Sequence, residues 1–432
     1  MKIAFFWFRR DLRLEDNAGF SAALQSKYPV LPLFIFDQTI LSQLEDQDDP
    51  RVTFIYEAIQ KMRLELEAVG GTLLAYYGKP VDIWKKLVND YDIAEVYTNH
   101  DYETYAIQRD DEIQTILKIH NIPLRTYKDQ VIFEKREVLN GKNEPYTVFT
   151  PYSKKWKSQL TDKDLAAYNC NQYFTNLYTV KVEALPSLTD MGFVLSPLYI
   201  PTSEVEEHTV VSYAKNRDYP ALDATTHLGI HLRFGTVSIR QLVSKARQWN
   251  EVWLNELIWR EFFMMILANF PQVEKHAFKP AYDRIQWRNN PEEFQKWCDG
   301  QTGYPIVDAG MRQLNETGFM HNRVRMITAS FLVKHLLIDW RWGEAYFARK
   351  LLDYELASNN GNWQWAAGSG CDAAPYFRVF NPALQTQKFD KSQAYIKKWV
   401  PEVGTENYPA PIVEHESARE RVLKAYKKAL QS

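Results

Sequence analysis

The chain has 432 residues, which is enough for two or three domains with large hydrophobic cores. Its formal net charge of −2 excludes a global positive field, so any contact with DNA or RNA must come from a local patch. The three cysteines lack metal-ligand spacing and indicate reduced thiols in a cytoplasmic protein. No apolar stretch has the length of a signal peptide or a membrane span, so no membrane partner is expected.

The first 128 residues alternate apolar runs of strand length with helical patterns. Strands are expected at residues 2–8, 30–36, 72–77, 93–98 and 124–127, and helices at 51–69, 81–89 and 105–120. Such alternation predicts an α/β domain with a doubly wound parallel sheet. The glycine-rich dinucleotide motif GxGxxG is absent, so this Rossmann-like domain, residues 1–128, is expected to be a scaffold or an accessory site.

The pattern breaks down over residues 129–211, where prolines and polar residues leave only short helices, notably at about residues 152–160. A connector of this length is uncommon inside one compact domain and argues for a domain boundary. From residue 212 to 432 the strand signals disappear, and an all-α domain is predicted. Its helices are expected at residues 239–248, 253–269, 291–300, 306–316, 322–337, 343–353, 391–400 and 414–430.

Residues 353–382 have an unusual composition for an ordinary soluble helix or strand. Asn359-Asn360-Gly361 is a turn signal, Trp363 and Trp365 follow it, and Asp372 is expected to cap another helix. Small residues let a flat ligand approach the backbone, amides supply directed hydrogen bonds, and indoles supply stacking surfaces. The alternative is a loop between two buried helices whose tryptophans belong to the core, because Trp is highly buried on average.

Three further clusters lie in the helical half. The hydroxyls and amides of residues 225–229 precede a short helical segment and suit a phosphate, although capping hydroxyls are common. Glu256 and Trp259 share a helical face and can read a base-like ligand, unless Glu256 instead forms a surface ion pair with Arg260. Within residues 320–326, Arg325 needs a partner on its mostly apolar helix, for which Asp353 is the natural candidate. No motif for hydrolysis or for a metal site is present.

Five stretches together resemble the photolyase/cryptochrome family. They are residues 7–17 (WFRRDLRLEDN), 302–309 (TGYPIVDA), 320–326 (MHNRVRM), 359–365 (NNGNWQW) and 372–382 (DAAPYFRVFNP). The similarity runs from residue 1 to near the C-terminus in the family's domain order, and it is closest to the class I cyclobutane pyrimidine dimer photolyases. This combination of motifs is highly specific.

The resemblance implies a folded FAD in the helical domain and a DNA lesion flipped out of the duplex above it. It implies light-dependent repair of cyclobutane pyrimidine dimers, in which excited FADH⁻ donates an electron to the dimer, the ring splits and the electron returns. UV-damaged DNA is then the partner and a monomer the expected state. A cryptochrome-like blue-light photoreceptor without repair activity is the alternative.

The resemblance also implies the role of individual residues. FAD contacts match Tyr213, Thr225, Thr226, His227, Leu228, Gly229, Trp253, Glu256, Arg260, Arg325, Asp353, Glu355 and Asn359, and Asn359 matches the residue that faces flavin N5. The residues at the reacting dimer match Glu256, Trp259, Asn322, Met326, Asn359 and Trp365. DNA contacts match Arg217, Glu256, Trp259, Asn322, Arg323, Trp365 and Gln385, and the electron-transfer chain matches Trp287, Trp340 and Trp363.

Single positions indicate the subclass. Enzymes that repair (6-4) photoproducts carry histidines where this chain has Asn322 and Met326, and plant cryptochromes carry an acid in place of Asn359. His227 and Gly229 replace an Arg and a Ser that are frequent in the phosphate element, and residues near 402–408 lack an insertion found in relatives. Tyr105 and Ala106 stand where the folate antenna of this subclass is contacted by Asn and Glu, so the second chromophore is another one or none.

Overall fold

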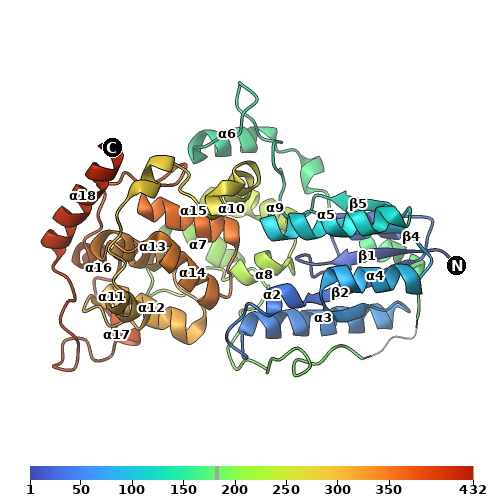
Figure 1. Cartoon of the computed structure of the whole chain (residues 1–432), viewed down its shortest axis with the longest axis horizontal. Coiled ribbons are helices and arrows are strands. Elements are labelled where there is room, and N and C mark those ends of the chain that lie inside the picture. The colour runs from blue at the N-terminus through green and yellow to red at the C-terminus, as the bar shows by residue number, and fades with distance from the viewer. Residues whose placement is uncertain (181–183, 432) are drawn as a thin grey trace. The chain divides into compact units, whose positions relative to one another are not determined.

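A computed structural model describes residues 1–180 and 184–431 of the chain (Figure 1). The chain divides into two compact units. The first contains residues 1–134, 159–204 and 227–248, and the second contains residues 135–158, 205–226 and 249–432. Both units are built from separated stretches of the chain, and the domain boundaries expected after residues 128 and 211 stay a prediction.

The first unit is organised around one parallel sheet. Its strands in the described part of the chain are β1 (Ile3–Phe8), β2 (Val30–Asp37), β3 (Leu74–Gly78), β4 (Ile93–Asn99) and β5 (Leu124–Tyr127). Their order is β3-β2-β1-β4-β5, and every neighbouring pair is parallel. Strand β1 is central, with Phe6 opposite Pro32 of β2 on one side and Tyr97 of β4 on the other. The sheet confirms the predicted α/β class.

Helices cover both faces of this sheet, which explains why β1 is a continuous apolar run (Figure 1). Phe6 and Phe8 belong to a core shared with α1 and α3, whereas Phe5 and Trp7 belong to the core shared with α4 and α5. The helices assigned to this unit are α1 (Ala18–Leu24), α2 (Gln38–Leu41), α3 (Pro50–Ala68), α4 (Pro80–Asp90), α5 (Thr104–Ile119), α8 (Gly229–Phe234) and, except for its last residue, α9 (Ile239–Trp249).

The second unit is helical, as predicted. Its helices are α6 (Phe149–Gln159), α7 (Glu207–Asn216), α10 (Glu251–Asn269), α11 (Pro291–Cys298), α12 (Pro305–Thr317), α13 (Asn322–Ser330), α14 (Trp340–Lys350), α15 (Leu356–Ala367), α16 (Pro382–Phe389), α17 (Ala394–Trp399) and α18 (His415–Gln431). A π-helical turn, Phe331–His335, extends α13. One large core draws on α11 to α15 and includes Trp297, Trp340 and Trp363. Among the described residues, no helix is both long and apolar enough to cross a membrane.

Two local predictions were wrong in residues 353–382. The turn expected at residues 359–361 is part of α15, and Gly361 serves helix packing instead: a Cβ there would lie 2.2 Å from the Phe263 ring of α10. Asp372 does not cap a helix. Its Oδ2 accepts a hydrogen bond from the backbone N–H of Phe149 at 2.9 Å, which ties this loop to the start of α6.

Candidate functional site

Helix α10 carries four of the expected site residues. The side chain of Asn250 caps the helix by accepting from Val252 N at 2.9 Å, in keeping with the preference for Asn at this position. Trp253, Glu256, Trp259 and Arg260 follow at helical spacings that place them along adjoining faces. Trp253 is buried, whereas Glu256 and Trp259 are partly exposed. One helix therefore contributes both a buried wall and groups that solvent can reach.

Two ion pairs hold the segment before α15. Arg325 of α13 donates to Asp353 at 3.0 Å, which confirms the expected partner, and Arg260 lies 3.2 Å from Glu355. The other oxygen of Asp353, Oδ1, is buried and has no hydrogen-bond partner within the described chain. A buried carboxylate oxygen needs a donor. This set of residues therefore fits a polar ligand that brings N–H or O–H groups.

Asn359 is fixed by a residue that the sequence did not reveal. Its side-chain N–H groups donate to Glu344 Oε1 at 2.8 Å and to Glu344 O at 3.1 Å. Burial raises the pKa of the Glu344 carboxyl, and the hydrogen bond from Asn359 opposes that rise. Because the amide donors are engaged, the carbonyl oxygen of Asn359 is the atom that remains to accept from a ligand.

Trp259 is held by aromatic stacking. Its ring lies 3.7 Å from the Phe149 ring at an interplanar angle of 5°, and 5.4 Å from Phe263 at 29°. The backbone of Phe149 is fixed in turn by Asp372. Sequence reasoning missed Phe149, since nothing in the local pattern around it indicates a partner on α10.

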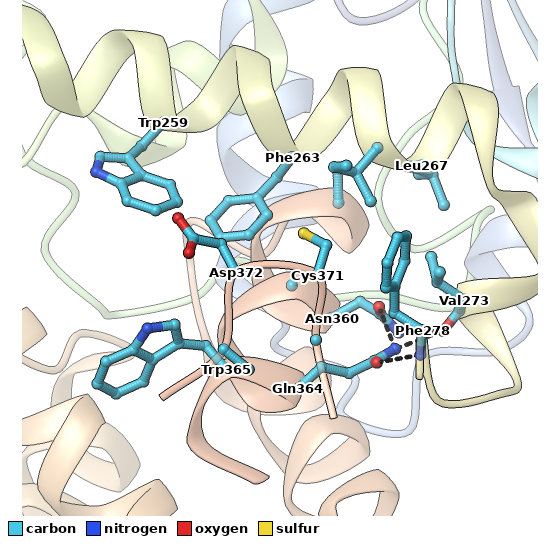
Figure 2. Close-up of a pocket in the computed structure, with 15 residues that line it drawn as sticks. Trp259, Phe263, Leu267, Val273, Phe278, Asn360, Gln364, Trp365, Cys371 and Asp372 are labelled. Carbon is cyan, nitrogen blue, oxygen red and sulfur yellow. Dashed lines mark hydrogen bonds between the residues drawn. The ribbon is translucent and has the colours of Figure 1, made fainter. Parts of the chain in front are cut away.

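A pocket lies beside Trp259 and Trp365 (Figure 2). Figure 2 shows these two indoles on the same side of the pocket, with the carboxylate of Asp372 between them in that view. Phe149 is not among the lining residues, so its stack supports Trp259 from outside the pocket. The lining amide of Gln364 is already bonded to the backbone of Val273, at 3.0 Å, and to other groups. The pocket therefore offers mainly apolar and aromatic surface.

Charged groups also meet at the start of α13. Arg323 donates to Asp218 at 2.7 Å and lies 4.3 Å from the centre of the Phe389 ring. Arg217 pairs with Glu256. Burial raises the pKa of Glu256, and the neighbouring guanidinium opposes this rise. Asp218 was not singled out from the sequence, where a single exposed acid carries no signal.

The three tryptophans expected in an electron-transfer chain share one core. Trp340 and Trp363 are both 2% exposed, and Trp287 packs against the same cluster. The ring of Trp363 lies 5.0 Å from Phe347, and that of Trp287 lies 6.0 Å from Tyr426. At both ends of the expected chain, another aromatic ring thus packs against the indole.

The residues expected at the FAD phosphates fall in both units. In the second, Tyr213 lies on α7 under the guanidinium of Arg217, at 5.6 Å, and the partly exposed Thr225 and Thr226 come after that helix. In the first, Leu228 is the N-cap of α8 and Gly229 begins that helix, which confirms a short helix after the threonines. His227, the remaining residue expected at the phosphates, has a φ of 51°.

The remaining residues expected at the lesion and the DNA lie on two helices: Asn322 and Met326 on α13, and Gln385 on α16. Among the described residues, no group of three or more His, Cys, Asp or Glu side chains is arranged to hold a metal ion.

Comparisons with known proteins identify the family. Residues 4–169 match the model of the DNA photolyase family, and residues 253–405 match the FAD binding domain of DNA photolyase. The chain is 38% identical to the deoxyribodipyrimidine photo-lyase of Escherichia coli, with 98% of each chain covered. The chain belongs to the DNA photolyase family. It is a photolyase, and its cofactor is FAD.

Two further relatives agree. The deoxyribodipyrimidine photo-lyase of Synechococcus sp. is 36% identical over 97% of this chain and 95% of its own. The crystal structure of a bacterial class III photolyase from Agrobacterium tumefaciens superposes with a TM-score of 0.88 at 31% identity, covering 100% of this chain and 98% of that one. The photolyase family is thus supported by sequence and by fold across the whole chain.

The pair Arg260–Glu355 leads to a stability prediction. Replacing Arg260 with Met leaves the buried Glu355 carboxylate without that counter-charge, which should lower the free energy of unfolding by about 3 kcal/mol. Glu355→Gln should be similarly destabilising, and the double variant should recover most of the loss. Denaturant unfolding, with flavin content as a second readout, checks this. If the loss of unfolding free energy in the double variant equalled the sum of the two single losses, the pairing would be contradicted.

Proposed function

We propose that this photolyase repairs cyclobutane pyrimidine dimers in DNA under blue or near-UV light. The observation that carries the proposal is the pair of indoles, Trp259 and Trp365, at one pocket, because two aromatic surfaces suit an unstacked pair of pyrimidines. Asn322 and Met326 at the start of α13 support this lesion class, because neither supplies the histidines of (6-4) repair. The Escherichia coli relative, a deoxyribodipyrimidine photo-lyase, supports it as well.

FAD would be held by the residues around the two ion pairs. When bound, reduced and excited by light, FAD supplies the electron that opens the cyclobutane ring. Asp353 would accept from the cofactor through its unpartnered Oδ1 and is oriented by Arg325 through Oδ2. Arg260 and Arg325 compensate the charges of Glu355 and Asp353, so these four side chains together would add little net charge beside the flavin. The carbonyl of Asn359 would accept from an N–H of the flavin without adding a negative charge.

The lesion would be recognised by charged side chains and by aromatic stacking. Extruding a base from DNA costs a few kcal/mol, and the cost is lowest for damaged bases, which are already poorly stacked. Trp259, supported by Phe149, would replace the lost stacking, and Glu256 would accept from base N–H groups. Arg323 and Gln385 would contact the DNA around the lesion.

Other roles remain part of the proposal. Trp363, Trp340 and Trp287 would return oxidised flavin to its reduced state, since indoles are oxidisable and these three share one core. The hydroxyl of Tyr105 donates to Asp37 Oδ2 at 2.7 Å. A second chromophore other than folate, or none, stays a prediction. A cytoplasmic location and a monomeric state stay predictions.

The deciding experiment uses one oligonucleotide with a single thymine dimer and a matched one with a (6-4) photoproduct. Reduced protein is incubated with each in darkness and under blue light. Light-dependent restoration of the dimer alone is expected. Bound, reducible flavin without any repair would favour a photoreceptor, and restoration of the (6-4) photoproduct would overturn the lesion class.

Trp259→Ala should weaken binding of dimer-containing DNA by about tenfold or more, because base–aromatic stacking contributes about 1–3 kcal/mol per base. Flavin content should stay unchanged. Phe149→Leu should give a smaller loss, since it leaves the indole in place but removes its support. Binding titrations in darkness measure both effects. Unchanged lesion affinity in Trp259→Ala would mean that this residue has been assigned wrongly.

Trp363→Phe should slow photoreduction of oxidised flavin by at least about tenfold, because phenylalanine is far harder to oxidise than indole. Repair by chemically pre-reduced protein should be spared. Absorbance of the flavin under illumination measures the first, and dimer restoration the second. Loss of repair in the pre-reduced variant would show that Trp363 has another role.

A further inference from the structure

Two residues at the end of α7 each hold one group of the proposed lesion site. Arg217, which caps α7, pairs with Glu256 of α10. Its neighbour Asp218 accepts from Arg323 of α13 at 2.7 Å. These four side chains, Arg217, Asp218, Glu256 and Arg323, are called the charge quartet below.

The four side chains of the charge quartet are partly exposed to solvent, and they form ion pairs and contacts with aromatic rings. The side chains of Arg217 and Glu256 are 30% and 31% exposed, and that of Asp218 is 41% exposed. Arg217 also lies over the Tyr213 ring, and Arg323 over the Phe389 ring. Aromatic contacts thus hold both guanidinium groups, and the side chains of Arg217 and Arg323 are 30% and 16% exposed. Each positive charge faces a carboxylate of the same chain.

We propose that the charge quartet controls DNA binding: Asp218 and Glu256 hold the two arginines until DNA phosphates displace them, and Glu256 sets the selectivity for damaged DNA. The proposal rests on the function proposed above. When a phosphate pairs with Arg217, the carboxylate of Glu256 loses its partner. In damaged DNA a flipped thymine exposes its Watson–Crick N–H group to Glu256 in exchange, whereas in intact DNA that N–H is engaged in base pairing.

Loss of the Arg217–Glu256 pair therefore weakens binding to intact DNA more than it weakens binding to DNA that carries a lesion. A protein can discriminate by leaving a charge unpaired in the wrong complex, and here that charge is Glu256. Asp218 has a different effect. It competes with phosphate for Arg323 in every complex, so it lowers affinity for intact and damaged DNA alike. Asp218 is therefore a positioning residue for Arg323, and Glu256 is the selective one.

The test compares Glu256→Gln and Asp218→Asn with the unchanged protein in darkness, by titration against duplexes with and without one thymine dimer at several salt concentrations. Glu256→Gln should bind intact DNA about threefold or more tightly and bind the dimer no better, so selectivity falls. Asp218→Asn should tighten both complexes to a similar degree. In both variants the slope of log K against log salt for intact DNA should steepen, by up to about 0.9, as one more phosphate is neutralised.

Glu207→Gln is the matched control. Glu207 is an exposed acid in the first turn of α7 and has no ion pair within the described part of the chain, so its loss changes net charge without releasing an arginine. It should leave the salt slope unchanged. Flavin absorbance and melting temperature confirm that every variant is folded.

Two outcomes overturn the inference. One is a Glu256→Gln variant that binds intact DNA with the affinity and salt slope of the unchanged protein. The other is a control that changes both as much as the two variants do. If the protein still repairs dimers, either result rejects the role proposed for the quartet and leaves the proposed repair function intact. A different result would reject the repair function and not the quartet. In that case the protein repairs no dimer, but its affinity for intact DNA rises only when Glu256 or Asp218 is neutralised, as expected if these acids hold the arginines.

Discussion

The site depends on the close packing of α10 against α15. Gly361 permits it, because any side chain there would meet the Phe263 ring. The amides of Asn360 and Gln364 then bond to the backbone carbonyl of Val273, just beyond the end of α10, at 2.9 and 3.0 Å. These buried hydrogen bonds leave little freedom in how the two helices sit, since an unpaired buried amide is costly. As a result the indoles on the two helices line one pocket, and Arg260 on α10 meets Glu355 at the start of α15.

Charge balance is the second constraint on this unit. Buried carboxylates need a compensating charge, because an uncompensated buried charge is strongly destabilising. Asp353 and Glu355 each have an arginine from another helix, and Asn359, although neutral, is oriented by Glu344. A similar compensation occurs on α10, where Glu256 pairs with Arg217 at the end of α7. Helix packing and ion pairing therefore define together what the pocket can accept.

The sequence predicted the regular parts of the fold well because their patterns are local. The central strands β1 and β2 are almost entirely apolar and buried throughout, and most helices of the second unit have periodic apolar faces. Helix α15 was missed because Asn359-Asn360-Gly361 has the composition of a turn, whereas tertiary packing against Phe263 decided its conformation. The pair Arg325–Asp353 could be predicted, since a charge on an apolar helix needs a partner. Phe149, Asp218 and Glu344 could not, because each acquires its role only through a partner on another element.

The net charge of −2 is consistent with this organisation. A protein with a strongly basic surface would bind all DNA tightly and would search it slowly for rare lesions, since affinity without selectivity comes mainly from phosphate contacts. Here the arginines near the site are paired with acids of the same chain, so contact with intact DNA requires an exchange of partners. We expect the exchange to become favourable when the lesion itself supplies new hydrogen bonds and stacking surfaces. Local pairing can thus give selectivity to a protein that has no overall electrostatic attraction for its substrate.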